Sequence, residues 1–381
     1  MEYDMSEQEK LKRFADIDSL KGVAVCAVVW VHSGGGTIGG ILGGLGASGA
    51  YWVEMFFMLT VYLACFSLES RVKSANSFLK VSVQWFFERI WKLTPLYYLA
   101  MAAYLVIVPP GANIWMGTVE RYSTLNVIMH LFYLHGFFPY FANSIMWVEW
   151  YIGVMVIYLA IIPILYRYGG KSKVSGIVGI VLIMLSVIGT CILQHLHFCK
   201  DQYIWDGWVY TYSFIVHFPA LTCGMWLYTL RDMRNNKCHS NGMFAVSIIG
   251  YICLACLSTY FNEASWIWLV RTLAFDFIFF LVIVSKKVSA CVVLNNRICR
   301  KIGQNSYSIY LFHFLLVYLG GCLISDEAAL HIIHSPLVWQ IMKSTIIILS
   351  CFIFSVVYEK TIGERIYQWG KRKISGYFAS L

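Results

Sequence analysis

The sequence carries little charge for its length. Asp, Glu, Lys and Arg make up only 13% of its 381 residues, while hydrophobic residues make up 59%. A soluble domain has about 25% charged residues. The longest stretch expected outside a membrane runs from about 110 to 145, and no segment has the composition of a soluble domain. These absences exclude a soluble globular protein and indicate a protein embedded in a membrane.

Features of several other classes are also lacking. The first hydrophobic run begins late and a second follows at once, so we expect no cleaved signal peptide. Of the 12 cysteines, only Cys199 lies clearly on the expected outer side and Cys322 lies near it, so we expect no disulfide framework. His195 and His197 beside Cys199 offer too few ligands for a metal, and no metal site is expected.

Long hydrophobic runs are the dominant feature that is present. A helix needs about 20 apolar residues to cross a hydrocarbon core about 30 Å thick. Ten runs reach this length: 21–45, 50–69, 85–109, 146–166, 175–194, 208–230, 243–261, 265–285, 303–324 and 336–358. An eleventh run, 125–138, is shorter and contains histidines, which predicts a re-entrant or interfacial helix. The predicted fold is all-α, a polytopic membrane protein with ten transmembrane helices.

Basic residues are distributed unequally about these ten spans. If the amino terminus is cytoplasmic, 25 of the 29 Lys and Arg residues fall on the cytoplasmic side, Arg121 and Lys200 fall outside, and Arg271 and Lys343 lie within spans. Basic residues accumulate on the cytoplasmic side of membrane proteins, so both termini are predicted to be cytoplasmic. The chain then divides into a cytoplasmic segment 1–20, a membrane domain 21–358 and a basic cytoplasmic tail 359–381. The net charge of +9 is explained by this topology and by anionic lipid, without nucleic acid.

Lys21 and His32 lie eleven positions apart on the first hydrophobic run. On a helix this spacing places His32 about 16 Å beyond Lys21, which is half the thickness of the hydrocarbon core. The lysine is then at the membrane surface and the histidine near its middle. Polar groups at such depth usually face a cavity or a partner inside the bundle. His32 is therefore a candidate functional residue, the alternative being a histidine bonded to a neighbouring helix.

A series of motifs resembles acyltransferase family 3. The first is the basic residue at Lys21, ten further residues and then His32, and the second is the acidic-x-Phe-Phe stretch that begins at Glu54. The others follow in order: Arg89–Pro95, His135–Pro139, Trp150–Gly153 with Tyr158 and Pro163, Ser306–His313, and Glu359–Lys360. Order and spacing cover nearly the whole chain.

The resemblance implies transfer of an acyl group, most simply acetyl, from cytosolic acyl-coenzyme A to a hydroxyl of a carbohydrate or glycolipid. Acyl-coenzyme A would be a substrate, so no permanently bound cofactor is expected, and the setting would be a bacterial-type cytoplasmic membrane. A neutral imidazole in a desolvated site suits the base that takes the hydroxyl proton. Alternatively, His32 is a nucleophile that carries the acyl group between the two substrates.

Arg89 and Lys92 are candidates for binding the phosphates of coenzyme A. They lie three positions apart at the cytoplasmic end of a helix, so they share one face, and Lys21 at the same depth adds a third charge. The alternative is that these residues only set the topology.

Four further residues are candidates on the acceptor side or beside the base. Glu54 is predicted to orient His32 and stabilise its protonated form, unless it is a solvated interfacial residue. Trp150 and Tyr151 are predicted to form a platform for a sugar ring, the alternative being an aromatic belt. His313 is predicted to line a substrate tunnel, the alternative being a packing role.

Two departures from the family pattern concern the acceptor. Met155 and Val156 stand where many members carry a glutamate pair, and Thr60-Val61 stands where Ser-Gly is usual. The competing function is a proton-coupled transporter that uses His32, Glu54 and Arg271 as a proton path. No inverted repeat of the transporter kind is evident in the sequence.

Overall fold

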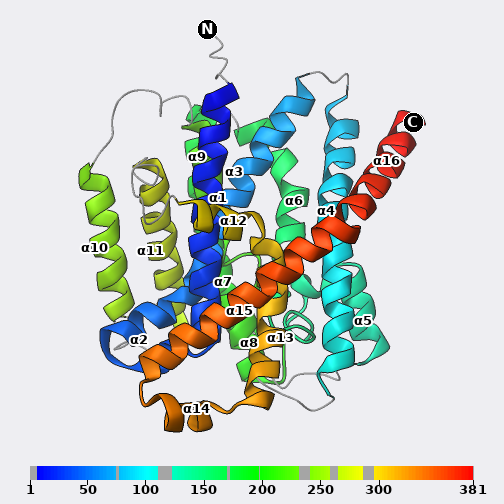
Figure 1. Ribbon diagram of the computed structural model, residues 1–381. Helices are drawn as coiled ribbons and strands as arrows, with labels where there is room; N and C mark the ends of the chain where they lie inside the picture. Colours follow the sequence, from blue (N-terminus) through cyan, green and yellow to red (C-terminus); the bar gives the residue numbers. More distant parts are fainter. Residues whose placement is uncertain are drawn as a thin grey trace. The chain divides into compact units, whose positions relative to one another are not determined.

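A computed structural model describes residues 7–73, 77–109, 122–169, 172–196, 198–230, 241–257, 265–285 and 296–380. Within these ranges every regular element is a helix and there is no strand (Figure 1). The predicted all-α class is therefore confirmed. Contacts between Cα atoms divide the chain into two compact units, which are described separately. The first unit consists of Met1–Phe56, Arg234–Asn262 and Ala274–Ser355. The second unit consists of Phe57–Met233, Glu263–Leu273 and Val356–Leu381.

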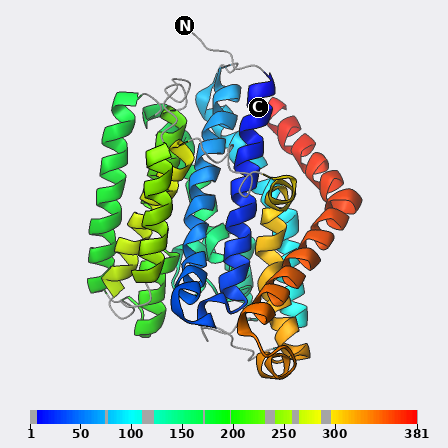
Figure 2. The same cartoon turned by 60° about the vertical axis from the view of Figure 1, so that its left-hand side comes forward.

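The first unit is built around the amino-terminal helix α1. Its helices are α1 (Glu7–His32), α2 (Gly40–Ala47), α10 (Asn241–Leu257), α12 (Arg297–Gln304), α13 (Ser306–Leu323), α14 (Asp326–Ile333) and most of α15 (Pro336–Tyr358). Helix α1 packs against α12 and α13. A Cβ on Gly303 of α12 would lie 1.7 Å from the carbonyl oxygen of Asp18, so only glycine allows this approach. The short helix α14 leads from α13 into α15 at the lower end of Figure 2.

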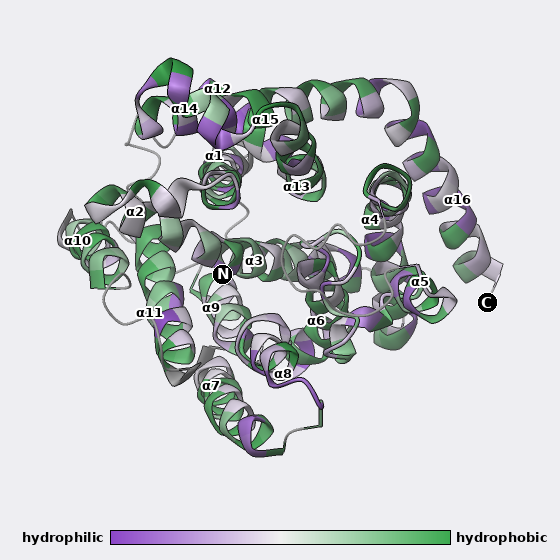
Figure 3. Cartoon of the chain, turned by 90° about the horizontal axis from the view of Figure 1, so that it is seen from below, coloured by the Kyte–Doolittle hydropathy of each residue, from purple (hydrophilic) through white to green (hydrophobic). Residues whose placement is uncertain are grey.

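The second unit contains the remaining helices. They are α4 (Phe78–Ile107), α5 (Thr124–Leu131), α6 (Trp150–Gly169), α7 (Ser172–Leu196), α8 (Gln202–Gly207), α9 (Phe218–Thr229) and α16 (Glu364–Ser380). Helices α3 (Trp52–Val72) and α11 (Ser265–Val284) contribute residues to both units. Helix α7 packs against α9, and α16 packs against α4. In Figure 3, α7 is hydrophobic along most of its length, whereas α16 mixes hydrophobic and polar residues.

Seven helices in the described part of the chain are long and apolar enough to cross a membrane. They are Gly40–Val72, Phe78–Ile107, Trp150–Gly169, Val174–Leu196, Ile267–Val284, Ser306–Leu323 and Pro336–Ser380. Each contains most of one predicted span. The count of ten spans is not confirmed, because the three other predicted runs have a different form.

These three runs differ for identifiable reasons. The run 21–45 is not one helix, because α1 ends at His32 and Gly34 and Gly39 adopt positive φ values of 108° and 86° before α2 begins. The run 208–230 is divided into a π-helical turn at Trp208–Tyr212 and the twelve-residue α9, which has a proline in its first turn. The run 243–261 ends as a helix at Leu257, and residues 258–261 lie outside the described ranges.

The segment predicted as a re-entrant or interfacial helix is a short helix. Helix α5 has eight residues and is followed by a 3-10 turn at Leu134–Phe137. Ser123 caps α5, since its side chain accepts a hydrogen bond from the backbone N–H of Asn126. The glycine-rich segment before α3 is also helical. A Cβ on Gly46 would lie 2.2 Å from the carbonyl oxygen of Gly35, so these glycines allow close packing within the segment.

Candidate active site

His32 and His313 lie side by side in the first unit. His32 is the last residue of α1, and His313 lies in the middle of α13. Nδ1 of His32 is 2.8 Å from Nε2 of His313, and the two rings are stacked with centroids 5.1 Å apart. The ring of Phe314 lies 4.5 Å from that of His32 on a tilted plane. Two histidines that the sequence singled out separately therefore form one pair.

The direction of the hydrogen bond follows from the second nitrogen of His313. Nδ1 of His313 is 2.6 Å from the carbonyl oxygen of Tyr310, which only accepts, so this nitrogen carries the proton in a neutral ring. Nε2 of His313 is then an acceptor, and Nδ1–H of His32 donates to it. This arrangement leaves the lone pair on Nε2 of His32, the tautomer that a base or nucleophile needs.

Exposure differs between the two rings. His313 is completely buried, whereas His32 is only half-buried. Within the described ranges, the hydrogen bond of His32 is the one to His313, so its Nε2 remains available. His32 therefore has the geometry of a reacting group, and His313 has the geometry of a group that orients it.

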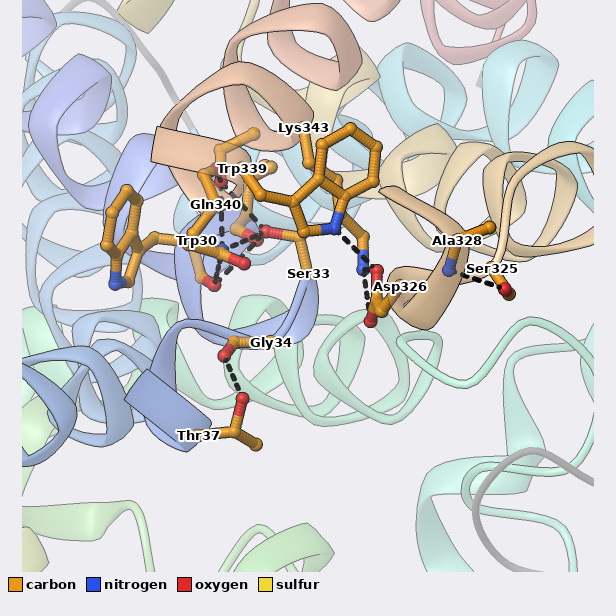
Figure 4. A network of polar contacts seen from close by, with 12 residues as sticks. Trp30, Ser33, Gly34, Thr37, Ser325, Asp326, Ala328, Trp339, Gln340 and Lys343 are labelled. Carbon is orange, nitrogen blue, oxygen red and sulfur yellow. Dashed lines mark hydrogen bonds and ion pairs between the residues drawn. The ribbon is translucent and has the colours of Figure 1, made fainter. Parts of the chain in front are cut away.

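A network of buried polar side chains fixes the end of α1 next to His32 (Figure 4). Gln340 of α15 donates from Nε2 to the carbonyl oxygen of Trp30 at 3.0 Å and to Oγ of Ser33 at 2.8 Å. Oγ of Ser33 also lies 2.9 Å from Oγ of Ser344. The last carbonyl groups of a helix have no partner inside the helix. Gln340 satisfies one of them and so holds the turn that carries His32.

Helix α15 is itself held by α14. The carboxylate of Asp326 accepts hydrogen bonds from Nζ of Lys343 at 2.8 Å and from Nε1 of Trp339 at 2.8 Å (Figure 4). Burial alone would raise the pKa of Asp326, but these two donors outweigh burial and lower the pKa below its ordinary value. Lys343, which the sequence placed inside a span, is thus paired.

Glu54 lies in a buried environment. Its side chain is 3% exposed, so it is not a solvated interfacial residue, and its carboxyl interacts electrostatically with that of Asp276, which is 1% exposed. Its predicted role as the partner of His32 remains a prediction. Lys21 forms an ion pair with Asp18 at 3.8 Å, one turn earlier on α1.

Arg89 and Lys92 lie on α4 in the second unit. The guanidinium of Arg89 is 5.5 Å from the centroid of the Trp85 ring, and the side chain of Lys92 is exposed. The adjacent Glu88 is buried and accepts a hydrogen bond from Arg71 at 2.7 Å. Glu88 is thus paired with Arg71 and also attracts the guanidinium of Arg89, while Glu359 and Glu364 attract the ammonium group of Lys92.

Trp150 and Tyr151 begin helix α6. The ring of Trp150 is stacked on His217 with centroids 5.3 Å apart, and it lies 5.4 Å from the ring of Tyr212. Tyr151 is buried, with its ring 4.6 Å from that of Phe57. Trp150 is half-buried, so of the two predicted platform residues it has the more accessible ring.

A second cluster of histidines, around Glu149, was not predicted from the sequence. The buried carboxylate of Glu149 accepts hydrogen bonds from the backbone N–H groups of Ile145, Met146 and Val148 and lies 3.3 Å from Nε2 of His130. Nε2 of His135 donates to the carbonyl oxygen of Glu149 at 2.9 Å. The available signal was the histidine content of the run 125–138, but nothing in it identified Glu149 as the partner.

In the part of the chain that the structure describes, no three His, Cys, Asp or Glu side chains are arranged so that they could hold a metal ion. His195 donates from Nδ1 to the carbonyl oxygen of Cys191, one turn earlier on α7. His197, the other histidine considered as a ligand, lies outside the described residues.

One comparison with known proteins gives a match. The family model described as an acyltransferase domain, of the type designated family 3, matches residues 14–358. Neither the comparison with curated proteins nor that with solved structures gives a match. The matched range contains every residue assigned above to the candidate site and ends at the last residue of α15.

Proposed function

Since the chain belongs to acyltransferase family 3, we propose that it transfers an acyl group from acyl-coenzyme A to a hydroxyl of a cell-surface or exported carbohydrate. The family match and the seven long apolar helices together indicate a membrane acyltransferase. The finer assignment, with acetyl as the simplest acyl group and a carbohydrate as acceptor, rests on the family motifs and on the chemistry of the His32 pair.

The observation that carries this function is the hydrogen bond between Nδ1 of His32 and Nε2 of His313. In the proposed reaction, Nε2 of His32 takes the proton of the acceptor hydroxyl as its oxygen attacks the thioester carbonyl. The tetrahedral intermediate then collapses, the carbon–sulfur bond breaks, and the imidazolium returns the proton to the departing thiolate. The bond to His313 holds the ring so that Nε2, and not Nδ1, faces the reaction.

A covalent route uses the same nitrogen. Nε2 of His32 attacks the thioester carbonyl, the carbon–sulfur bond breaks, and coenzyme A leaves as the thiolate, so that an acyl-imidazolium forms. The acceptor hydroxyl then attacks this acyl group and gives its proton to the thiolate, and the imidazole is released in its neutral form. Mass spectrometry of the protein after incubation with acyl-coenzyme A distinguishes the routes, because only the covalent route gives an acyl adduct on His32.

Arg89 and Lys92 are assigned to the phosphates of the donor. Guanidinium and ammonium groups bind phosphate through charge-assisted hydrogen bonds. Their loss should therefore raise KM for acyl-coenzyme A more than it lowers kcat, because phosphates are remote from the bond that breaks.

The function is tested by comparing membranes that contain the chain with membranes that lack it. Membranes with the chain should transfer label from acetyl-coenzyme A to carbohydrate, and mass spectrometry should find new acetyl esters on cell-surface glycans. Absence of both thioester turnover and acylated carbohydrate would contradict the proposed function. In sealed vesicles, the donor should be needed on the cytoplasmic face, because it is too polar to cross the bilayer.

One observation favours a second candidate, a proton-coupled transporter. Glu54 and Asp276 are two buried carboxyl groups that interact electrostatically within the first unit. Intramembrane acidic residues occur in proton pathways. Thioester turnover by the purified protein separates the candidates, since a transporter would show none.

A further inference from the structure

Helix α16 lies beyond the range that matches the family and packs against α4, the helix that carries Arg89 and Lys92. Most of α16 is polar or basic, with Lys371, Arg372 and Lys373 in succession. The sequence predicted this segment as a basic cytoplasmic tail. Its contacts with α4 connect it with the candidate donor residues.

Trp91 of α4 is the centre of the contact. Its Nε1 donates to the carbonyl oxygens of Ile366 and Tyr367, each at 3.3 Å. Its ring also lies 5.8 Å from that of Trp369. A Cβ on Gly370 would be 1.9 Å from Cε2 of Trp91, so the indole ring lies directly against the backbone of α16.

A second set of contacts lies one turn earlier on α4. The carboxylate of Glu88 accepts from Nε2 of Gln84 at 2.9 Å and from Oγ of Ser375 at 3.4 Å. Nε2 of Gln84 also lies 3.5 Å from Oγ of Ser375. Lys371 is near enough to Glu88 to interact with it electrostatically. A buried carboxylate whose hydrogen bonds are satisfied is held rigidly in place, so these contacts fix Glu88 against α16.

The positions of these residues around α4 show how they are related to Arg89 and Lys92. Gln84, Glu88 and Trp91 follow the spacing i, i+4, i+7, so they share the face that α16 covers. Arg89 and Lys92 each follow one of these residues directly and therefore lie about 100° further round the same helix. Residues of α16 and of the turn before it also interact electrostatically with the two donor residues. Tyr367 interacts with Arg89, and Glu359 and Glu364 interact with Lys92.

We propose that α16 forms one side of the acyl-coenzyme A site and positions Arg89 and Lys92 for the nucleotide phosphates of the donor. This role rests on the proposed function, because it concerns the same donor. Trp91 and Glu88 fix α4 against α16, and Lys371 adds positive charge beside the row of Arg89 and Lys92. The carboxylates of Glu359 and Glu364 hold the ammonium group of Lys92 at this surface.

Two glycines of α16 provide a matched test. Gly370→Ala introduces a methyl group into the Trp91 ring, whereas a Cβ on Gly376 meets nothing within 4 Å, so Gly376→Ala is the control. Both substitutions raise helix propensity to the same extent. Trp91→Phe is a milder second variant that removes the two hydrogen bonds and keeps an aromatic ring.

The measurement is isothermal titration of the purified full-length protein with acetyl-coenzyme A and with adenosine 3′,5′-bisphosphate, the nucleotide end of the donor. Gly370→Ala should weaken binding of both ligands by about tenfold, which corresponds to the loss of one charge-assisted hydrogen bond. Trp91→Phe should weaken both in the same direction, and Gly376→Ala should bind as the unchanged protein does.

The outcomes separate this inference from the proposed function. If the unchanged protein binds acetyl-coenzyme A and both Gly370→Ala and Trp91→Phe bind both ligands with unaltered affinity, α16 has no part in the donor site and the proposed function stands. Weaker binding of acetyl-coenzyme A with unaltered binding of the bisphosphate would also overturn the role in phosphate recognition. If the unchanged protein binds neither ligand, the proposed donor itself is wrong.

Discussion

The described part of the chain contains two stacked pairs of histidines whose surroundings differ. The rings of His32 and His313 have centroids 5.1 Å apart and an interplanar angle of 13°, and those of His130 and His135 are 4.3 Å apart at 5°. The geometry of stacking is therefore similar. The pairs differ in the hydrogen-bond partners and the accessibility of their ring nitrogens.

In the second pair, both nitrogens of His130 lie against acceptors, and Nε2 of His135 donates to the carbonyl oxygen of Glu149. Nδ1 of His130 donates to the carbonyl oxygen of Asn126 at 2.8 Å, and its Nε2 faces the carboxylate of Glu149. Both rings are completely buried. In the first pair, half-buried His32 keeps Nε2 available. A histidine pair that is completely buried thus stabilises a segment, whereas a pair with one accessible ring nitrogen can do chemistry.

Alanine substitutions should separate the two pairs by their effect on stability. His130→Ala removes a buried ring that lies 3.3 Å from the carboxylate of Glu149 and 2.8 Å from the carbonyl oxygen of Asn126, so we expect a loss of about 3 kcal/mol. His32→Ala removes a half-buried ring and its contact with Phe314, and we expect a loss of about 1 kcal/mol. Thermal unfolding of both purified variants in detergent measures the difference. Equal unfolding temperatures would show that the His130 cluster is not a structural anchor.

Substitutions of His313 should sharpen the distinction between a reacting and an orienting histidine. His313→Phe removes the acceptor for Nδ1–H of His32, so the tautomer is no longer fixed and turnover should fall by about 10–100-fold. His313→Gln offers a carbonyl oxygen as acceptor and should recover part of this loss. The pH–rate profile should shift in His313→Phe, which a purely structural defect would not produce. Equal activities of the two variants would contradict the orienting role.

A smaller loss of activity is expected from a substitution of Gln340, which contacts the residues that flank His32. Gln340→Leu removes the hydrogen bonds to Trp30 and Ser33 and leaves buried polar groups unsatisfied. The expected cost is about 1–3 kcal/mol in stability, with a rate reduction smaller than that of His313→Phe. Gln202→Leu is the control, because the side chain of Gln202 is exposed and, among the described residues, donates to Asp206 on its own helix. The unfolding temperature and the transfer rate are measured for both variants. Identical values would contradict the role of Gln340 in holding the end of α1.

Much of the helical architecture could be predicted from the sequence because membrane-spanning helices are long and continuously apolar. The seven confirmed runs have this property. The ends of the other runs could not be predicted in this way. Hydropathy does not detect the positive φ of Gly34, which ends α1 at His32, or the π-helical turn at Trp208–Tyr212, because both depend on backbone conformation within an apolar stretch.

The site could be predicted only as separate residues. The sequence singled out His32 and His313, but they are 281 positions apart and no periodicity links them. It assigned Glu54 to His32 because their helices are adjacent in the chain, whereas the structure places the Glu54 carboxyl near Asp276. The contact of α16 with α4 depends on the close approach of Gly370 to Trp91, for which a single glycine in a basic tail gives no signal.

The central claim is that Nε2 of His32 performs the acyl transfer. The most direct measurement is the initial rate at which the purified protein in liposomes moves labelled acetyl from acetyl-coenzyme A to a carbohydrate acceptor, with His32→Ala assayed in parallel. Loss of a positioned base typically costs about 10²–10⁴ in rate, so the variant should be slower by at least about 100-fold while its unfolding temperature stays near that of the unchanged protein. Transfer by His32→Ala at the rate of the unchanged protein would contradict the claim.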